Sequence, residues 1–217
     1  LFSADYKYVN FEFSSIDTDM AAKLLNSIKT NSTGWDGINI TIVKLFCPTI
    51  LPYLTHIINE CINTNTFPTA WKKALVIPIA KIPNPKEYKD LRPISILPVM
   101  SKILEKIIDS QLRAYLNTNH AFLQNQSGFR AGHSCATAIL HVTDDILRAT
   151  DQGKVSVLTL LDFSKAFDTV DHDILTSILR SFGLSPNATA LIQTYLKDRS
   201  QCVHLMGSTS PYRKLTR

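Results

Sequence analysis

The sequence predicts an α+β fold. Stretches with an apolar residue every three or four positions, which indicate helices, are mixed with short apolar runs that indicate strands. Their order follows no regular strand–helix–strand repeat, which argues against a parallel α/β fold. With 217 residues, 45% of them hydrophobic, the chain is long enough for one substantial core or two subdomains.

Two helices are expected in the first third of the chain. One has a single apolar face and is expected to start near Ser15 or Asp17, because these residues are favourable helix caps. The second is expected over about residues 50–62, with Pro48 and Pro52 near its start, where proline is tolerated.

A strand and a long helix are expected next. Residues 74–82 (ALVIPIAKI) predict a strand, and Pro78 argues for an edge position because it cannot donate to a hydrogen-bond ladder. Residues 83–98 form a basic, proline-rich loop that returns into a short apolar run. The helix is expected over about residues 99–116, with Ile103 on its inner face.

The second half begins with a helix expected over about residues 135–148. Residues 155–163 (VSVLTLLDF) are a continuous apolar run, which is typical of a strand buried on both faces. Helices near 172–182 and 187–198 then precede a candidate hairpin over residues 201–216.

Net charge, cysteine content and hydropathy exclude only a few classes of protein. The net charge of +5 fits a nucleic-acid-binding protein but also many other enzymes. The four cysteines form no CxxC pair, so we expect reduced, mostly buried thiols rather than a zinc site or disulfides. No apolar run has membrane-spanning length and no signal peptide is evident, so we expect a soluble, intracellular protein.

Asp162 is the acid that most needs an explanation. It ends the apolar run, and a carboxylate buried there would cost several kcal/mol without a cation or hydrogen-bond donors. A strand end is a rigid mount for a ligand of Mg²⁺, which prefers oxygen donors. On spacing alone, Asp162 could equally cap the following helix or pair with a nearby lysine.

Other acids have simpler explanations. Asp171 and Asp173 stand at the start of a predicted helix, where acids cap free N–H groups and oppose the helix dipole. Asp144 and Asp145 belong to the solvated face of an amphipathic helix. Asp168 lies between these two cases.

Four blocks in order carry a resemblance to a known family. Residues 158–175 (LTLLDFSKAFDTVDHDIL) resemble the first palm motif of reverse transcriptases of the non-LTR, LINE-like and jockey-type, retrotransposons. Upstream, residues 32–38 (STGWDGI) are similar to an amino-terminal extension motif of that group, and residues 76–107 and 125–139 are similar to its fingers motifs. The resemblance implies right-hand polymerase fingers with the first part of the palm.

The resemblance implies roles for three residues of the palm block. Asp162 would be the first catalytic aspartate and a ligand of both metal ions, with the backbone carbonyl of Phe163 assisting. Phe167 would stand under the nucleotide sugar and disfavour a 2′-hydroxyl group. From the pattern alone, Phe167 could equally be an aromatic on the core side of a turn.

The fingers blocks would bind nucleotide and template. Arg92 would contact the triphosphate, because a planar guanidinium matches phosphate oxygens, with Lys81 or Lys86 assisting. The template-gripping residues would be Gln126, Gly128, Phe129 and Arg130.

The expected catalytic set is incomplete in these 217 residues. The family's Gly-x-Pro-Gln-Gly block and its Tyr/Phe-Ala-Asp-Asp hairpin do not occur in them. We therefore expect a chain truncated before the Asp-Asp hairpin. Residues 1–152 would be a fingers-like region with an amino-terminal extension, and residues 153–217 would be the start of the palm and a return into the fingers, incomplete. Two-metal catalysis needs carboxylates on both ions, so we expect weak Mg²⁺ binding and little or no catalysis.

Three functions follow as hypotheses. The first is a reverse transcriptase segment that, in the intact enzyme, extends a DNA primer with dNTPs along an RNA template, using two Mg²⁺ ions or Mn²⁺. The partners would then be template, primer, dNTPs and the remainder of the polymerase chain, in the cytoplasm or nucleus and away from membranes. The alternative is an inactive nucleic-acid-binding fragment of a decayed mobile element. A metal phosphohydrolase, suggested by Asp-His-Asp at 171–173, is weak because the further histidines lack ligand spacing.

Overall fold

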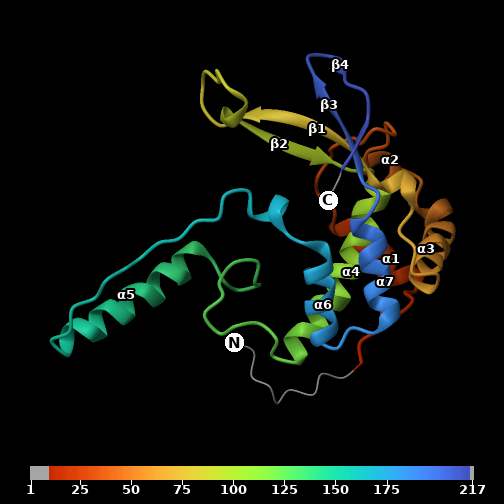
Figure 1. Cartoon of the computed structure of the whole chain (residues 1–217). Helices are drawn as coiled ribbons and strands as arrows, with labels where there is room; N and C mark the ends of the chain where they lie inside the picture. Colours follow the sequence, from red (N-terminus) through yellow and green to blue (C-terminus); the bar gives the residue numbers. More distant parts are fainter. Residues whose placement is uncertain (1–9, 216–217) are drawn as a thin grey trace. The chain divides into compact units, whose positions relative to one another are not determined.

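The structure, a computed structural model, describes residues 10–215 and divides into two compact units (Figure 1). Unit 1 comprises residues 10–115 and 171–215, and unit 2 comprises residues 116–170. The α+β expectation is confirmed, with a mixed five-stranded sheet in unit 1. Within residues 10–215, no helix is long and apolar enough to cross a membrane.

The core of unit 1 is helical. Four helices build most of it, namely α1 (Thr18–Ser27), α3 (Cys47–Asn63), α4 (Val99–Thr118) and α7 (Pro186–Leu196). The side chains of Ile103, Leu104 and Ile107 on α4 are fully buried among apolar side chains of the other three helices. The long helix expected over residues 99–116 is therefore confirmed, including its inner face.

Helix α1 starts where its cap predicts. The Asp17 carboxylate accepts a hydrogen bond of 2.7 Å from the backbone N–H of Met20 and so satisfies one free donor of the first turn. Ala21 and Leu25 form its buried face. Of the two starts that the sequence allows, the structure has Asp17.

Helix α3 starts three residues earlier than the pattern suggests. It begins at Cys47 with Pro48 in its first turn, while Pro52 lies inside the helix, where it removes one intrahelical hydrogen bond. The helix is preceded by α2 (Ile40–Leu45), which the sequence did not reveal. Six residues are too few to show a helical period.

The last two helices agree with expectation. Helix α6 (His172–Ser181) ends before Gly183, whose φ of +86° lies in the region that glycine adopts without strain. Helix α7 begins after Ser185, whose hydroxyl accepts a 3.0 Å hydrogen bond from the N–H of Ala188.

The sheet of unit 1 combines parallel and antiparallel pairs. Its strands are β1 (Lys73–Ala80), β2 (Leu91–Ile96), β3 (Ser200–Leu205), β4 (Ser208–Thr209) and β5 (Arg213–Lys214). Strand β1 pairs antiparallel with β2 and parallel with β3, and β3 pairs antiparallel with β4 and β5. The hairpin expected over residues 201–216 is confirmed for its described residues, but β2 had been expected as a loop.

The expected edge position of the Pro78 strand is wrong for its first half. Strand β1 lies between β2 and β3, but its parallel pairing with β3 covers only Lys73–Val76. Pro78 stands beyond that pairing and opposite Pro93 of β2. The proline is tolerated because no strand needs its missing N–H on the other side.

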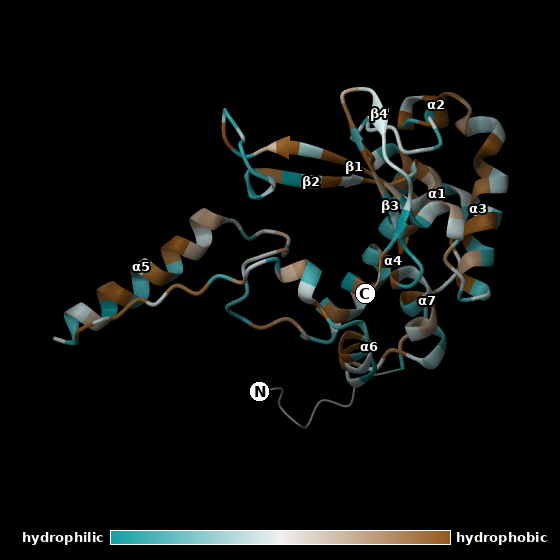
Figure 2. Ribbon diagram, turned by 45° about the horizontal axis from the view of Figure 1, so that its top comes forward, coloured by the Kyte–Doolittle hydropathy of each residue, from teal (hydrophilic) through white to brown (hydrophobic). Residues whose placement is uncertain are grey.

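Unit 2 consists of one amphipathic helix with long connecting segments. Helix α5 (Cys135–Asp151) is confirmed and starts at a Ser134–Thr137 capping box. It has no buried residue, and its large apolar side chains are exposed, among them Ile139, Leu140 and Leu147. Figure 2 shows hydrophobic residues along this helix.

The strand expected over residues 155–163 is wrong. Residues 154–163 form irregular coil, and part of it lies beside α5, where Ser156–Leu158 help to line a hollow with Val142 and Ile146. The apolar side chains of this coil are largely exposed, with Val155 at 92% and Leu160 at 85%. A strand inside a sheet needs paired neighbours for its backbone groups and packed layers on both faces. Residues 155–163 pair with no strand in the part of the chain that is described.

The 32–38 block packs against the start of α4. A Cβ added to Gly34 would lie 2.9 Å from the nitrogen of Pro98 and 3.1 Å from the carbonyl carbon of Leu97. The Lys102 ammonium on α4 also donates a 2.6 Å hydrogen bond to the hydroxyl of Ser32. The glycine is therefore required by a close approach of two backbone segments.

We expect Gly34→Ala to lower the free energy of unfolding of unit 1 by about 1–3 kcal/mol, because the new methyl group meets backbone atoms that cannot turn aside. Both tryptophans, Trp35 and Trp71, lie in unit 1, so urea unfolding followed by their fluorescence reports on this unit. Thr33→Ala, an exposed neighbour, is the control and should stay within about 0.5 kcal/mol of the parent. Equal stability of Gly34→Ala and the parent would contradict the close packing.

We expect the 217-residue chain alone to bind the dye ANS and to associate on size-exclusion chromatography, because unit 2 exposes a large apolar surface. Replacing Leu140, Leu147 and Leu160 together by glutamine should lower both signals, since all three side chains are more than half exposed. Replacing buried Leu104 by glutamine is the contrasting control and should raise them. A monodisperse, cooperatively melting parent without dye binding would show that the apolar surface is covered.

Candidate functional site

Arg92 lies on β2 with an exposed side chain. In the antiparallel pair of β1 and β2 it stands opposite Ile79. A strand in a paired ladder holds the base of the side chain rigidly, and the guanidinium offers a planar set of donors. The position therefore suits an anionic oxygen-rich group such as phosphate.

The two lysines expected beside Arg92 lie in the loop that joins β1 to β2. The Lys81 ammonium donates a 2.7 Å hydrogen bond to the carbonyl of Lys89, and its backbone N–H donates to the carbonyl of Asp90 at 2.8 Å. The backbone N–H of Lys86 donates to the Asp90 carboxylate at 3.0 Å, and its side chain is exposed. Lys81 thus closes the hairpin, a role that the sequence did not reveal.

The tip of this hairpin presents an aromatic ring that sequence reasoning missed. Tyr88 is 95% exposed at the start of the short helix η2 (Tyr88–Asp90). Glu87 and Asp90 hold the turn through a reciprocal capping box, and Lys89 pairs with Glu87 at 2.8 Å. The ring therefore projects from a locally braced turn. An exposed aromatic between lysines is the signal that could have found it.

The expected template-binding residues lie in one loop of unit 2. The Arg130 guanidinium donates through Nη1 to the carbonyls of Leu123 at 2.9 Å and Gln126 at 3.2 Å. The Gln126 side chain donates to the carbonyl of Gly128 at 3.2 Å. Phe129, with a φ of +59°, is mostly exposed. The loop is braced from within, and Arg130 supplies much of the bracing.

Asp162 is exposed in the coil that follows α5, and the side chain of its neighbour Phe163 is 79% exposed. The expectation that Asp162 ends a buried strand is therefore wrong, because residues 154–163 form exposed coil that pairs with no strand among residues 10–215. The carboxylate and the Phe163 carbonyl are oxygen donors of the kind that Mg²⁺ binds. These two oxygens fit the ion in kind, because Mg²⁺ commonly takes one or two protein oxygens and fills its other positions with water and phosphate.

Metal-ligand chemistry is sparse in the rest of the chain as well. Among residues 10–215, no group of three or more His, Cys, Asp or Glu side chains could hold a metal ion. This includes the Asp-His-Asp segment at 171–173, where the Asp171 carboxylate accepts two hydrogen bonds of 2.9 Å from the N–H groups of Asp173 and Ile174. Asp171 and Asp173 are confirmed as helix-start acids of α6.

Phe167 lies in the short helix η3 (Ala166–Thr169) and is 80% exposed. Its ring meets that of Phe129 edge to face, with centroids 6.0 Å apart and planes at 84°. The structure thus brings together one residue expected to read the sugar and one expected to bind template. Phe167 does not lie on the core side of its turn.

Asp144 and Asp145 agree with the solvated helix face expected for them, whereas Asp168, for which the sequence decided between no alternatives, lies at the surface. Asp144 pairs with Arg148 one helical turn on at 2.7 Å, and both side chains are exposed on α5. Asp145 is exposed on the same helix, and Asp168 is exposed in the first turn of η3.

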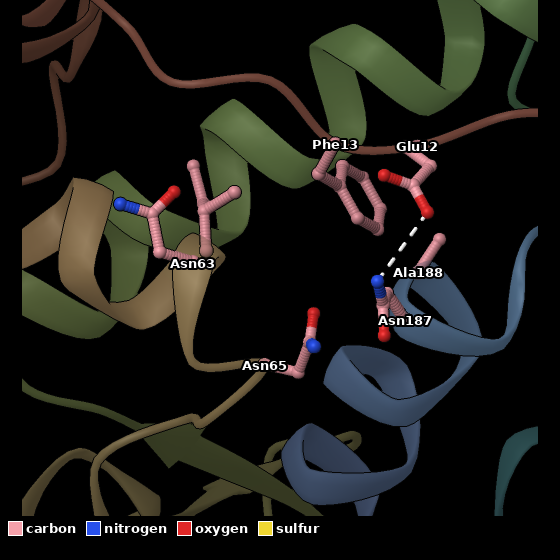
Figure 3. Close-up of a pocket in the computed structure, with 7 residues that line it drawn as sticks. Glu12, Phe13, Asn63, Asn65, Asn187 and Ala188 are labelled. Carbon is pink, nitrogen blue, oxygen red and sulfur yellow. Dashed lines mark hydrogen bonds between the residues drawn. The ribbon is translucent and has the colours of Figure 1, made fainter.

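Unit 1 contains a polar pocket of about 200 Å³ that the sequence did not suggest. Figure 3 shows the Asn187 amide and the Glu12 carboxylate within it, joined by a hydrogen bond of 3.4 Å. Its lining consists of Glu12, Phe13, Ile62, Asn63, Asn65, Asn187 and Ala188. None of the residues expected from the sequence to bind nucleotide, template or metal lines it.

A buried carboxyl in unit 1 was also missed. Burial raises the pKa of Glu105 on α4, while a 2.9 Å hydrogen bond from the Ser101 hydroxyl acts against the rise. Burial likewise raises the pKa of Tyr195, which hydrogen-bonds to Glu105. The nearby Arg199 donates to the Tyr195 carbonyl at 2.7 Å. These three half-buried residues lie at the edge of the helical core, where the contacts of Glu105 with Ser101 and Tyr195 indicate a structural role.

Comparison with known proteins identifies relatives among mobile elements. The family model described as reverse transcriptase (RNA-dependent DNA polymerase) matches residues 82–216. The chain is 33% identical over 181 residues to the probable RNA-directed DNA polymerase from transposon BS of Drosophila melanogaster, covering 82% of this chain and 20% of that protein. It is 30% identical over 179 residues to the RNA-directed DNA polymerase from mobile element jockey of the same species, with coverage of 82% and 19%.

A third relative agrees with these two. The probable RNA-directed DNA polymerase from transposon X-element of Drosophila melanogaster is 28% identical over 193 residues, covering 88% of this chain and 21% of that protein. The chain thus spans about a fifth of the length of these relatives. Because the family model matches well over half of its residues, the chain belongs to the reverse transcriptase family and is related to the polymerases of non-LTR retrotransposons of the jockey, BS and X-element kind.

Proposed function

We propose that this chain is a segment of an RNA-directed DNA polymerase of a non-LTR retrotransposon. It would supply the fingers and the first part of the palm, with residues 1–152 as a fingers-like region and residues 153–217 as the incomplete start of the palm. The observation that carries the proposal is the family match over residues 82–216, which contains Arg92, Asp162 and Phe167. In the intact enzyme, the reaction is extension of a DNA primer with dNTPs along an RNA template.

Each expected site residue has a role in this proposal. The Arg92 guanidinium binds phosphate oxygens of the incoming nucleotide, with Lys86 and Lys81 beside it in sequence. The ring of Phe167 lies under the sugar and excludes a 2′-hydroxyl group. The template lies along the loop with Gln126, Gly128, Phe129 and Arg130.

Asp162 and the carbonyl of Phe163 would hold Mg²⁺, or Mn²⁺ in its place. When bound, a pair of such ions stabilises the charge that develops on the attacking and leaving oxygens of phosphoryl transfer. The other carboxylates would come from a Tyr/Phe-Ala-Asp-Asp hairpin, which these 217 residues do not contain. The remainder of a polymerase chain is therefore a required partner, and we place the enzyme in the cytoplasm or nucleus.

The second candidate is a nucleic-acid-binding fragment of a decayed element, without chemistry. It is favoured by the lack of a three-ligand metal cluster within residues 10–215. The net charge of +5 and the exposed Lys86 and Arg92 would then serve sequence-independent contacts to phosphates.

Primer extension separates these candidates from a self-sufficient polymerase. We expect residues 1–217 to retain a primed RNA template in a salt-dependent manner and to add no dNTP in the presence of Mg²⁺. The measurement is extension of a labelled primer on a denaturing gel, with filter binding at several salt concentrations. A reverse transcriptase of known activity is the positive control. Robust extension by the 217 residues would show that their metal donors suffice.

Asp162→Asn should abolish synthesis in a complete polymerase chain that contains these residues, lowering kcat by at least about 10³-fold because a neutral amide is a poor metal ligand. Template affinity should change little, since the proposed role of the carboxylate is to bind the metal ion and not the template. Asp168→Asn, which removes a nearby exposed carboxylate, is the matched control and should retain activity. Undiminished synthesis by Asp162→Asn would exclude the residue as a ligand.

A further inference from the structure

Two mostly exposed aromatic rings of unit 2 contact each other across 38 positions of sequence. Phe129 and Phe167 meet edge to face at a centroid distance of 6.0 Å, although 76% and 80% of their surfaces are exposed. Apolar rings in a hydrophobic core would be buried, so this contact is not core packing. A contact between two surface rings is informative when the backbone that carries each ring is held in place.

The loop side of the pair is held by polar bonds. Arg130, next to Phe129, donates through Nη1 to the carbonyls of Leu123, Gln124 and Gln126 at 2.9, 3.4 and 3.2 Å. The Phe129 backbone has a φ of +59°, which a bulky residue adopts only where its surroundings impose it. The loop therefore fixes the backbone of Phe129 and with it the position of the Cβ that carries the ring.

The backbone on the other side is also fixed, but the ring is not. Lys165, with a φ of +52°, turns the chain into η3, and the N–H of Asp168 closes the turn on the Lys165 carbonyl at 2.9 Å. The Thr169 hydroxyl adds a 3.1 Å bond to the carbonyl of Ala166. These bonds hold the Cα of Phe167, whereas its exposed ring can still rotate about the side-chain bonds. The Phe129 ring lies where it restricts that rotation.

We propose that Phe129 is a positioning residue for sugar selection, acting through Phe167. The inference rests on the proposed role of Phe167 under the nucleotide sugar. A ring excludes one hydroxyl group only while it cannot move aside, because discrimination of this kind depends on placement within a fraction of an ångström. The loop that carries Phe129 and the ring of Phe167 then act together. A change in this loop alters the selectivity of the enzyme between dNTP and rNTP.

The test measures the ratio of kcat/KM for a dNTP to that for the matching rNTP, in a complete polymerase chain that contains these residues. Phe167→Val should lower this ratio by about 100-fold or more, since the ring itself is lost. Phe129→Leu should lower it about three- to tenfold, the size expected for one edge-to-face aromatic contact. Phe129→Tyr keeps an aromatic edge and should restore most of the ratio.

Two comparisons separate positioning from general damage. The double variant Phe129→Leu/Phe167→Val should show the same kcat/KM ratio as Phe167→Val alone, because Phe129 then has no ring to position. Leu123→Ala removes a 65% exposed side chain from the same loop and should leave the ratio unchanged. Template affinity is measured for every variant, so that loss of template binding is not mistaken for loss of sugar selection.

The outcomes distinguish this inference from the function on which it rests. If Phe167→Val leaves the ratio unchanged, the role of Phe167 is wrong and the inference falls with it. If Phe167→Val lowers the ratio but Phe129→Leu does not, or lowers template affinity alone, the polymerase proposal stands and the positioning role is overturned. Full additivity in the double variant also overturns it.

Discussion

Burial of one face of α4 is the interaction on which unit 1 depends. Ile103, Leu104 and Ile107 lose all contact with water, and each such side chain contributes about 1.5–3 kcal/mol. Val99, at the start of the helix, is also buried and follows the end of β2 by only three residues. The strand that carries Arg92 is thus tied directly to the helical core. The backbone of Arg92 is thereby held in place, while its side chain extends into solvent.

Unit 2 is held by a different kind of force. Helix α5 has no buried residue, so hydrophobic burial within the described residues contributes little to its order. Short hydrogen bonds hold its loops instead, with Arg130 bonded to neighbouring carbonyls and η3 closed on Lys165. Such local hydrogen bonds fix the conformation of single turns, but they do not determine the path of a long coil segment. The aromatic contact between Phe129 and Phe167 is the exception, since it links two distant segments.

The length of an element and its apolar period decide what the sequence could predict. The helices of ten residues or more agree with the sequence to within about three residues, α5 of unit 2 included, although the apolar face of α5 is exposed. The six-residue α2 is too short to show a period and was missed. Strand β2 was missed because Pro93 and its polar neighbours hide an exposed strand. The apolar run at 155–163 indicates side chains that are stabilised by burial. A sequence pattern does not say which surface covers them. No spacing rule could have paired Phe129 with Phe167.

The exposed run and the acid at its end are linked energetically. Five side chains between Val155 and Leu161 are 60–92% exposed, and covering them with an apolar partner surface would contribute on the order of 10 kcal/mol. Drawing Asp162 into the same environment would cost several kcal/mol unless a cation met it. The free energy gained by burying the five apolar side chains thus exceeds the cost of removing the Asp162 carboxylate from water. Any surface that covers these side chains must therefore also supply a cation or hydrogen-bond donors to Asp162, so the apolar run and the acid impose one combined requirement on whatever packs against them.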